Sequence, residues 1–277
     1  MSSQQIIDVW MQHPTQKFIN HPMFDSLRQW MKIGKVEQDI PAQFTISAMD
    51  AAQVNKGLIC SWYNTEGPLI SNEAVAQLVT QYPDRFVGIA SVPLNKPVPA
   101  VLELRRCVQE LQFKGLRIIQ WLWNLPATHA YYYPLFAECV QLGVPVCLQV
   151  GHTGPLMPSE VGRPIPYIDQ IAIDFPNLKI VCGHIGYPWT TEMIAVATKH
   201  KDVYIDTSAY AANRFPPELV AYLKAHGKNK VMFGSNYPMI TPAKCLQALE
   251  QLQLSEEVTQ KFLYENAVKV FALDDSF

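Results

Sequence analysis

The fold is decided by residues 144–182, which read VPVCLQVGHTGPLMPSEVGRPIPYIDQIAIDFPNLKIVC. The stretch begins and ends with a short apolar run, at Val144–Val150 and at Leu178–Cys182, and neither run alternates regularly between apolar and polar residues. Such runs are typical of parallel strands that are buried on both faces. Residues Tyr167–Asp174, between the two runs, have the apolar spacing of a helix. The stretch therefore predicts a strand, a helix and a second strand.

The same alternation continues along the rest of the chain. Further apolar runs lie at Ile6–Val9, Gly57–Trp62, Phe86–Val92, Gly115–Ile119, Val203–Asp206 and Val231–Gly234. Helical spacing recurs at Asn72–Gln81, Ala100–Leu111, Tyr133–Leu142, Glu192–Lys199, Glu218–His226 and Pro242–Leu252. Ser71 is placed to cap the start of a helix, and Gly143 and Gly227 are placed to end one.

Strands that each precede a helix, eight times in succession, predict an α/β fold of the (β/α)8 type, a TIM barrel. An open doubly wound sheet is the alternative. No glycine-rich phosphate loop follows any predicted strand, which disfavours a nucleotide enzyme. The segment Met11–Pro41 is long for a loop and contains a predicted helix at Met23–Lys32, so we expect a helical cap there. We expect residues 1–277 to form one barrel domain with an extra C-terminal helix.

The composition limits the partners and the location of the protein. The 277 residues include 22 Lys and Arg and 24 Asp and Glu, without a basic stripe, which argues against nucleic acid and anionic membranes as partners. The longest uncharged run, Ile118–Ala137, contains prolines and polar residues, and the N-terminus lacks the pattern of a signal peptide. The six cysteines form no CxxC pair and are expected to be reduced and mostly buried. We therefore expect a cytoplasmic protein, and its low charged fraction of 17% suggests a homodimer.

Polar residues follow most of the predicted strands, at the barrel end where active sites of this fold lie. Together with neighbouring aromatic residues they predict a pocket for a small-molecule substrate. They are Asp8, Trp10, Gln12, Arg117, Gln120, Gln149, His152, His184, Asp206, Ser208 and Asn236.

Six motifs resemble, in the right order, those of the amidohydrolase-related family, the metal-dependent barrel hydrolases and decarboxylases that include aminocarboxymuconate semialdehyde decarboxylase. The motifs are IIDVWMQHP (6–14), FKGLRI (113–118), VPVCLQVGHTGP (144–155), VCGHIGYPW (181–189), VYIDTSAY (203–210) and VMFGSNYPM (231–239). The resemblance covers essentially the whole chain. It implies the barrel fold, hydrolysis or decarboxylation, and dimerisation.

The sequence departs from the family at the metal ligands that the resemblance implies. The family's two first-strand histidines are replaced by Trp10 and Gln12, its fifth-strand histidine by Gln149 and its eighth-strand aspartate by Asn236. An indole has no lone pair to offer, and carboxamides are weak, neutral ligands. We therefore expect no metal and no cofactor. His184 keeps the identity of the family's sixth-strand histidine, an acid or base in the decarboxylases.

These substitutions leave several roles open. Gln12, Gln149 and Asn236 are expected to hold and polarise a substrate, with Trp10 in the space of the missing ion. Three further residues each have two interpretations. Arg117 either grips a substrate carboxylate or points outward to a helix, His152 either contacts the substrate or orients its loop, and Asp206 is either catalytic or bonded to nearby backbone.

The leading hypothesis is a metal-independent enzyme that acts on a small carboxylate-bearing substrate, either as a hydrolase, of a lactone or amide for example, or as a decarboxylase. His184 would carry the proton. The first alternative is a catalytically inactive barrel that binds a metabolite or a protein. The second is a metal hydrolase with unexpected ligands such as His184 and Asp206.

Overall fold

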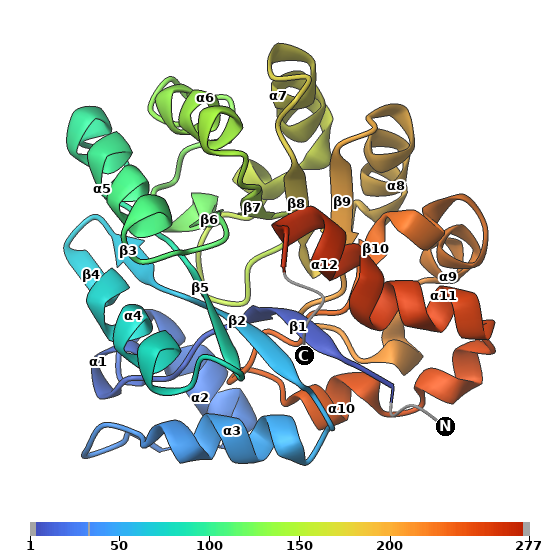
Figure 1. Ribbon diagram of the computed structural model, residues 1–277, viewed down its shortest axis with the longest axis horizontal. Helices are drawn as coiled ribbons and strands as arrows, with labels where there is room; N and C mark the ends of the chain where they lie inside the picture. The colour runs from blue at the N-terminus through green and yellow to red at the C-terminus, as the bar shows by residue number, and fades with distance from the viewer. Residues whose placement is uncertain (1–3, 33, 274–277) are drawn as a thin grey trace.

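The computed structural model describes residues 4–32 and 34–273. Within these ranges, eight parallel strands form two hydrogen-bonded groups, in the orders β1-β2-β5 and β10-β9-β8-β7-β6. Bridges between Ala90 and Leu116 and between Met11 and Tyr237 join the two groups at both edges. The sheet is therefore a closed barrel surrounded by helices (Figure 1), which confirms the TIM-barrel prediction and excludes the doubly wound alternative. The barrel strands are β1 (Ile7–Met11), β2 (Lys56–Cys60), β5 (Phe86–Ile89), β6 (Leu116–Ile118), β7 (Val146–Gln149), β8 (Ile180–Gly183), β9 (Val203–Asp206) and β10 (Val231–Met232).

The strands are buried because side chains fill the barrel on one face and helices cover the other. Every residue of β7, β8 and β9 is buried. This explains why their sequences do not alternate between apolar and polar residues. The outer helices are α4 (Asn72–Gln81), α5 (Pro97–Gln109), α6 (Tyr133–Leu142), α7 (Asp169–Asp174), α8 (Thr190–Lys199) and α9 (Pro217–Lys224).

Local signals placed some helix ends correctly and others wrongly. Ser71 accepts a hydrogen bond from Ala74 N at the start of α4, and Gly143 ends α6 with a left-handed φ of 69°, as predicted. Gly227 does not end α9, which stops at Lys224 and is followed by a separate 3₁₀ turn. The helix predicted at Pro242–Leu252 is α10 (Pro242–Leu246) only, because the backbone turns left-handed at Ala248.

The C-terminal segment closes one end of the barrel. The side chains of Tyr264, Ala267, Val270 and Phe271 pack in one core cluster with inward-facing strand residues such as Leu58. Figure 1 shows α12 (Asn266–Phe271) lying across the barrel opening, next to α11 (Glu256–Gln260). The extra C-terminal helix predicted from the sequence is therefore present, and it fills the barrel end opposite the site described below.

The loops after β1 and β2 build a cap at the other end. The predicted helix at Met23–Lys32 is α2 (Asp25–Met31), which is flanked by α1 (Gln16–Ile19) and α3 (Ala42–Asp50). After β2 the chain forms a hairpin of β3 (Trp62–Asn64) and β4 (Gly67–Ile70), which the sequence did not predict. The ring of Phe18 lies 4.8 Å from that of Phe24 and 4.9 Å from that of Trp62, so cap and hairpin pack together.

Two further expectations concern the chain as a whole. All six cysteines are free and buried, as expected of reduced thiols. Among the described residues, no helix is both long and apolar enough to cross a bilayer.

Candidate functional site

A cavity of about 270 Å³ opens at the carboxyl ends of the barrel strands. Its walls are mainly aromatic and aliphatic side chains from the cap and the strand-end loops, namely Phe24, Leu27, Trp30, Trp62, Trp121, Pro155, Ala209, Tyr210, Met239 and Ile240. Its polar side chains, apart from the Tyr210 hydroxyl and the Trp ring nitrogens, are Gln149, His152, His184 and Asn236. Four of the predicted site residues thus meet at one cavity. Trp10, Gln12, Arg117 and Asp206 do not line it and lie buried around its base.

The backbone at the base of the cavity is unusual. His184, Ala209 and Asn236, which follow β8, β9 and β10, have left-handed φ angles of 69°, 69° and 70°. This conformation is uncommon for residues with a side chain and costs free energy, and it is concentrated at functional sites. All three residues line the cavity, so these left-handed positions lie together at its base.

Trp10 lies under the cavity, against His184. The indole is 1% exposed, and its centroid lies 5.2 Å from that of the His184 ring. Gly183 makes room for it, because a Cβ atom at Gly183 would lie only 2.6 Å from Trp10 Cζ3. The indole therefore forms part of the support beneath the cavity.

Gln12 uses its side chain to fasten neighbouring segments. Its Nε2 donates to the carbonyl oxygen of Tyr237 at 2.5 Å and to Asn236 Oδ1 at 3.3 Å. Its Oε1 accepts from Trp62 Nε1 at 3.3 Å. Gln12 thereby orients two residues that line the cavity, Asn236 and Trp62.

His184 is held by Ser208. Its Nδ1 lies 2.6 Å from Ser208 Oγ, and its backbone N–H donates to the same oxygen at 3.2 Å. No bond from Nε2 is formed within the described residues, so this nitrogen is free toward the cavity. Burial lowers the pKa of His184 to about 3, with smaller contributions from the charges of Arg117 and His152. The imidazole is therefore neutral at physiological pH.

Two carboxyl groups of the barrel strands, Asp8 of β1 and Asp206 of β9, are fully buried. Burial raises the pKa of Asp206 to about 6, against the hydrogen bonds from the side chain and backbone of Ser208. Burial likewise raises the pKa of Asp8 to about 7, against the bonds from Ser235 and Trp10. Asp206 Oδ1 accepts from Ser208 N at 2.8 Å, which is the local backbone bond considered from the sequence. Asp206 thus holds Ser208, which in turn holds His184, and the His184 backbone N–H also acts to lower the pKa of Asp206.

Gln149 and Asn236 present uncommitted amide groups. The Gln149 carboxamide has no hydrogen-bond partner among the described residues, although its side chain is buried and lines the cavity. Asn236 accepts one bond from Gln12, and its Nδ2 is free within the same residues. His152 stands at the exposed mouth, where its Nδ1 lies 3.5 Å from the Tyr210 hydroxyl.

Arg117 lies inside the barrel, so the interpretation in which it points outward to a helix is wrong. Its Nη1 donates to Met11 O at 3.1 Å and its Nη2 to Val9 O at 3.2 Å. Its Cζ lies 4.0 Å from the Trp10 ring centroid. These contacts belong to β1 and not to the cavity surface, so Arg117 has no direct access to a bound molecule.

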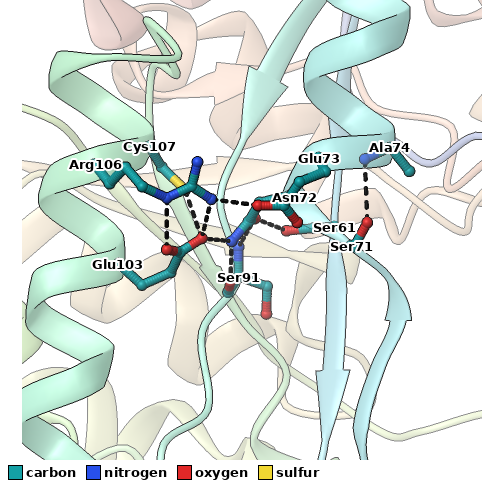
Figure 2. A network of polar contacts seen from close by, with 9 residues as sticks. All are labelled: Ser61, Ser71, Asn72, Glu73, Ala74, Ser91, Glu103, Arg106 and Cys107. Carbon is teal, nitrogen blue, oxygen red and sulfur yellow. Dashed lines mark hydrogen bonds and ion pairs between the residues drawn. The ribbon is translucent and has the colours of Figure 1, made fainter.

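A buried polar network, which sequence reasoning missed, supports the wall that contains Trp62. Figure 2 shows Asn72 between Ser61, Ser91 and Glu103. Asn72 accepts from Ser61 Oγ at 2.5 Å and donates to Ser91 O at 3.1 Å and to Glu103 Oε1 at 2.7 Å. The network ties the residue before β3 to α4 and α5. The only sequence signal was a polar residue directly after the predicted N-cap Ser71.

No group of three or more His, Cys, Asp or Glu side chains within the described residues is arranged to hold a metal ion. The hypothesis of a metal hydrolase with His184 and Asp206 as ligands is therefore not supported by any donor cluster in this part of the chain. Of these two residues, only His184 faces the cavity.

Comparisons with known proteins agree with this fold. The model of a family described as Amidohydrolase matches residues 62–273. A 2-amino-3-carboxymuconate-6-semialdehyde decarboxylase from Dictyostelium discoideum is 26% identical over 237 residues, which cover 73% of this chain and 66% of that protein. The chain thus spans about two thirds of the length of this relative.

Solved structures show the same fold. An uncharacterised TIM-barrel protein from Bordetella bronchiseptica superposes with a TM-score of 0.83 at 22% identity, covering 97% of this chain and 98% of that chain. A dihydroxybenzoic acid decarboxylase from Polaromonas, with bound manganese and an inhibitor, superposes with a TM-score of 0.71 at 19% identity, covering 99% and 98%. Because the family model spans well over half of its residues, this chain belongs to the amidohydrolase family.

Proposed function

We propose that the protein is a metal-independent hydrolase that opens an ester, lactone or amide bond in a small planar substrate, with His184 as the proton carrier. The observation that carries the proposal is a neutral, oriented His184 in one cavity with the free amide groups of Gln149 and Asn236. Such a cavity combines a proton acceptor with hydrogen-bond donors and has aromatic walls that suit a flat molecule.

The metal that the family resemblance implies does not fit the residues present. Trp10 supplies no lone pair. The carboxamide of Gln12 is already hydrogen-bonded to Tyr237, Asn236 and Trp62. The guanidinium of Arg117 stacks on Trp10, so a positive charge already lies beside these positions. A divalent cation would meet weak neutral donors and a repelling charge there.

The hydrogen bonds around Ser208 support the role of His184. Ser208 Oγ lies 2.6 Å from His184 Nδ1. In the proposed mechanism Nδ1 is protonated and donates to this oxygen, so that Nε2 is the unprotonated nitrogen toward the cavity. Asp206 Oδ1 accepts from Ser208 N and thereby helps to hold Ser208 in place.

The reaction balances without any other group. Nε2 of His184 takes a proton from water, whose oxygen forms a bond to the substrate carbonyl carbon. The carbonyl oxygen becomes an oxyanion, which Gln149 Nε2 and Asn236 Nδ2 can stabilise by donation. The bond from that carbon to the leaving oxygen or nitrogen then breaks, and His184 returns the proton to the leaving atom.

Decarboxylation of a carboxylate-bearing substrate, the other half of the leading hypothesis, is less well supported. No Lys or Arg is among the residues that line the cavity in the described chain, and Arg117 lies outside it. A His184 with a pKa near 3 also carries no extra proton to give to a carbanion. The activity named for the relatives remains the reason to test aromatic carboxylates as well.

A catalytically inactive barrel that binds the same kind of molecule is the second candidate. The observation that favours it is the low pKa of His184, because a base is efficient only when its pKa lies near the working pH. Binding without turnover of any compound tested would decide for this candidate.

The experiment is a turnover screen with dihydrocoumarin, aryl esters, aryl amides and aromatic carboxylates, each with and without a chelator. We expect hydrolysis of a lactone, ester or amide that the chelator leaves unchanged, that His184→Ala abolishes and that the control His129→Ala, outside the cavity, preserves. Turnover that a chelator stops, release of carbon dioxide from a carboxylate, or full activity in His184→Ala would overturn the proposal.

A further inference from the structure

Arg117 is a buried charge that forms no ion pair with a carboxylate of residues 4–32 or 34–273. Its side chain is 1% exposed, and its Nε has no hydrogen-bond partner among the described residues. Its other bonds go to the carbonyl groups of Val9 and Met11 and to Gln12 Oε1 at 3.5 Å, none of which carries a charge. Burying a charge without a bonded counter-ion is unfavourable, so the structure bears a cost in stability for a cation under the cavity.

The guanidinium of Arg117 lies inside the barrel, close to several strands. It is bonded to β1, and its charge affects ionisable groups on or directly after four other strands, namely Cys60, Cys147, His184 and Asp206. Asp206 is the carboxyl group among them. The charge of Arg117 opposes the rise that burial causes in the pKa of Asp206, but the two side chains form no ion pair within the described residues. Asp206 therefore offsets the field of Arg117 only in part.

The cavity lies within the field of this charge. The guanidinium is 4.0 Å from the Trp10 ring and that ring is 5.2 Å from the His184 ring. His184 is therefore within about 9 Å of the charge, with a buried indole and no bulk solvent between them. Screening by water and salt is weak in such a place.

We infer that Arg117 is the fixed cation of this site and determines its ligand class: planar molecules whose group at the base of the cavity carries, or acquires during reaction, a negative charge. The inference rests on the proposed function, in which the substrate carbonyl oxygen becomes an oxyanion. Arg117 acts through Trp10 and touches no ligand, so it is a positioning residue. It supplies the electrostatic assistance that a bound metal gives in other enzymes.

The test compares a charged and an uncharged probe of the same shape, benzoate and benzamide, by calorimetry. The variants are Arg117→Gln, which removes the charge, and Arg117→Lys, which keeps it. Both lose the planar fork, so their difference isolates the charge. We expect the preference for benzoate over benzamide to fall about tenfold in Arg117→Gln and to survive in Arg117→Lys. An equal preference in the wild type and Arg117→Gln would overturn the inference.

A second measurement covers the case in which the wild type binds neither probe. Histidine NMR titration reports the pKa of His184 directly, and its loss in His184→Gln assigns the resonance. We expect this pKa to rise in Arg117→Gln and to stay near the wild-type value in Arg117→Lys, and no rise in Arg117→Gln would overturn the inference. Neither readout requires turnover. If the protein hydrolyses no substrate but its preference for benzoate over benzamide depends on the charge at position 117, the proposed function is refuted and the role of Arg117 is retained.

Discussion

The guanidinium of Arg117 is stacked on the indole of Trp10 inside the barrel, with its Cζ atom 4.0 Å from the ring centroid. The residues come from β6 and β1, which are separated by β2 and β5 in the strand order, so the contact crosses the barrel interior. Trp10 in turn packs against His184, which lines the cavity. The pair links the packing of the barrel interior to the electrostatics of the site.

The first prediction concerns the packing role of Trp10. Replacing it by Ala would leave a hole between Gly183, His184 and Arg117 that the rigid strand ends cannot close. We expect Trp10→Ala to lower the free energy of unfolding by about 3–5 kcal/mol, measured by urea denaturation. The matched control is Trp30→Ala, because Trp30 is 83% exposed, and its expected cost is within about 0.5 kcal/mol. Equal effects of the two substitutions would show that Trp10 is not a packing residue.

The second prediction concerns the polar network around Asn72. In Asn72→Ala, Ser61 Oγ and Ser91 O each lose a partner, and Glu103 keeps only Arg106 and Cys107. We expect a loss of about 1–3 kcal/mol in the free energy of unfolding. Gln77→Ala is the control, since Gln77 lies on the exposed face of the same helix. Because the network anchors the hairpin, Trp62 fluorescence should also change in Asn72→Ala and not in the control.

The third prediction concerns pH and Asp8. Burial raises the pKa of Asp8 from 3.8 to about 7, so the folded state binds this proton more tightly than the unfolded state. The proton on Asp8 therefore stabilises the folded state by about 1.4 kcal/mol for each unit by which folding raises the pKa. This stabilisation is fully present below pH 4 and is lost as the pH rises toward 7. Asp8→Asn keeps the acceptor for Trp10 N and Ser235 N but cannot ionise.

Urea unfolding between pH 4 and pH 7 tests this sign. The stability of Asp8→Asn relative to the wild type should rise across this range by a few kcal/mol. The exposed Asp84 is the matched control, and Asp84→Asn should leave the pH dependence of the wild type unchanged. A stability difference between Asp8→Asn and the wild type that does not vary with pH would contradict the raised pKa.

The sequence was sufficient for the barrel because its signals are local and repeated. The cap at Ser71 and the left-handed Gly143 depend on chemistry within one turn, and a strand buried on both faces leaves its mark in consecutive residues. Helix α10 stops at Leu246 although residues 247–252 have helical spacing, because Ala248 is left-handed and a separate 3₁₀ turn follows at Leu249–Leu252. The spacing of apolar residues does not reveal such a local break.

The candidate site was predictable in part for the same reason. Strand ends meet at one barrel face, so Gln149, His184 and Asn236 could be grouped from their positions alone. The direction of Arg117 could not be predicted, because it depends on bonds to β1, whose Met11 lies 106 residues from Arg117 in the chain. The hairpin that brings Trp62 to the cavity depends likewise on the buried Asn72.

The last prediction concerns Gln149 as a donor to the oxyanion of the proposed hydrolysis. Its carboxamide is buried, lines the cavity and has no partner among the described residues, so its N–H groups are available to a substrate. Gln149→Leu keeps the volume and removes the donor. We expect kcat for the best ester or lactone substrate to fall by about a hundredfold or more while KM changes little, because the bond strengthens only as negative charge develops. Gln141→Leu, on the exposed face of α6, is the control and should leave both constants unchanged. If KM rises and kcat stays constant, Gln149 binds substrate and transition state equally and is not an oxyanion donor.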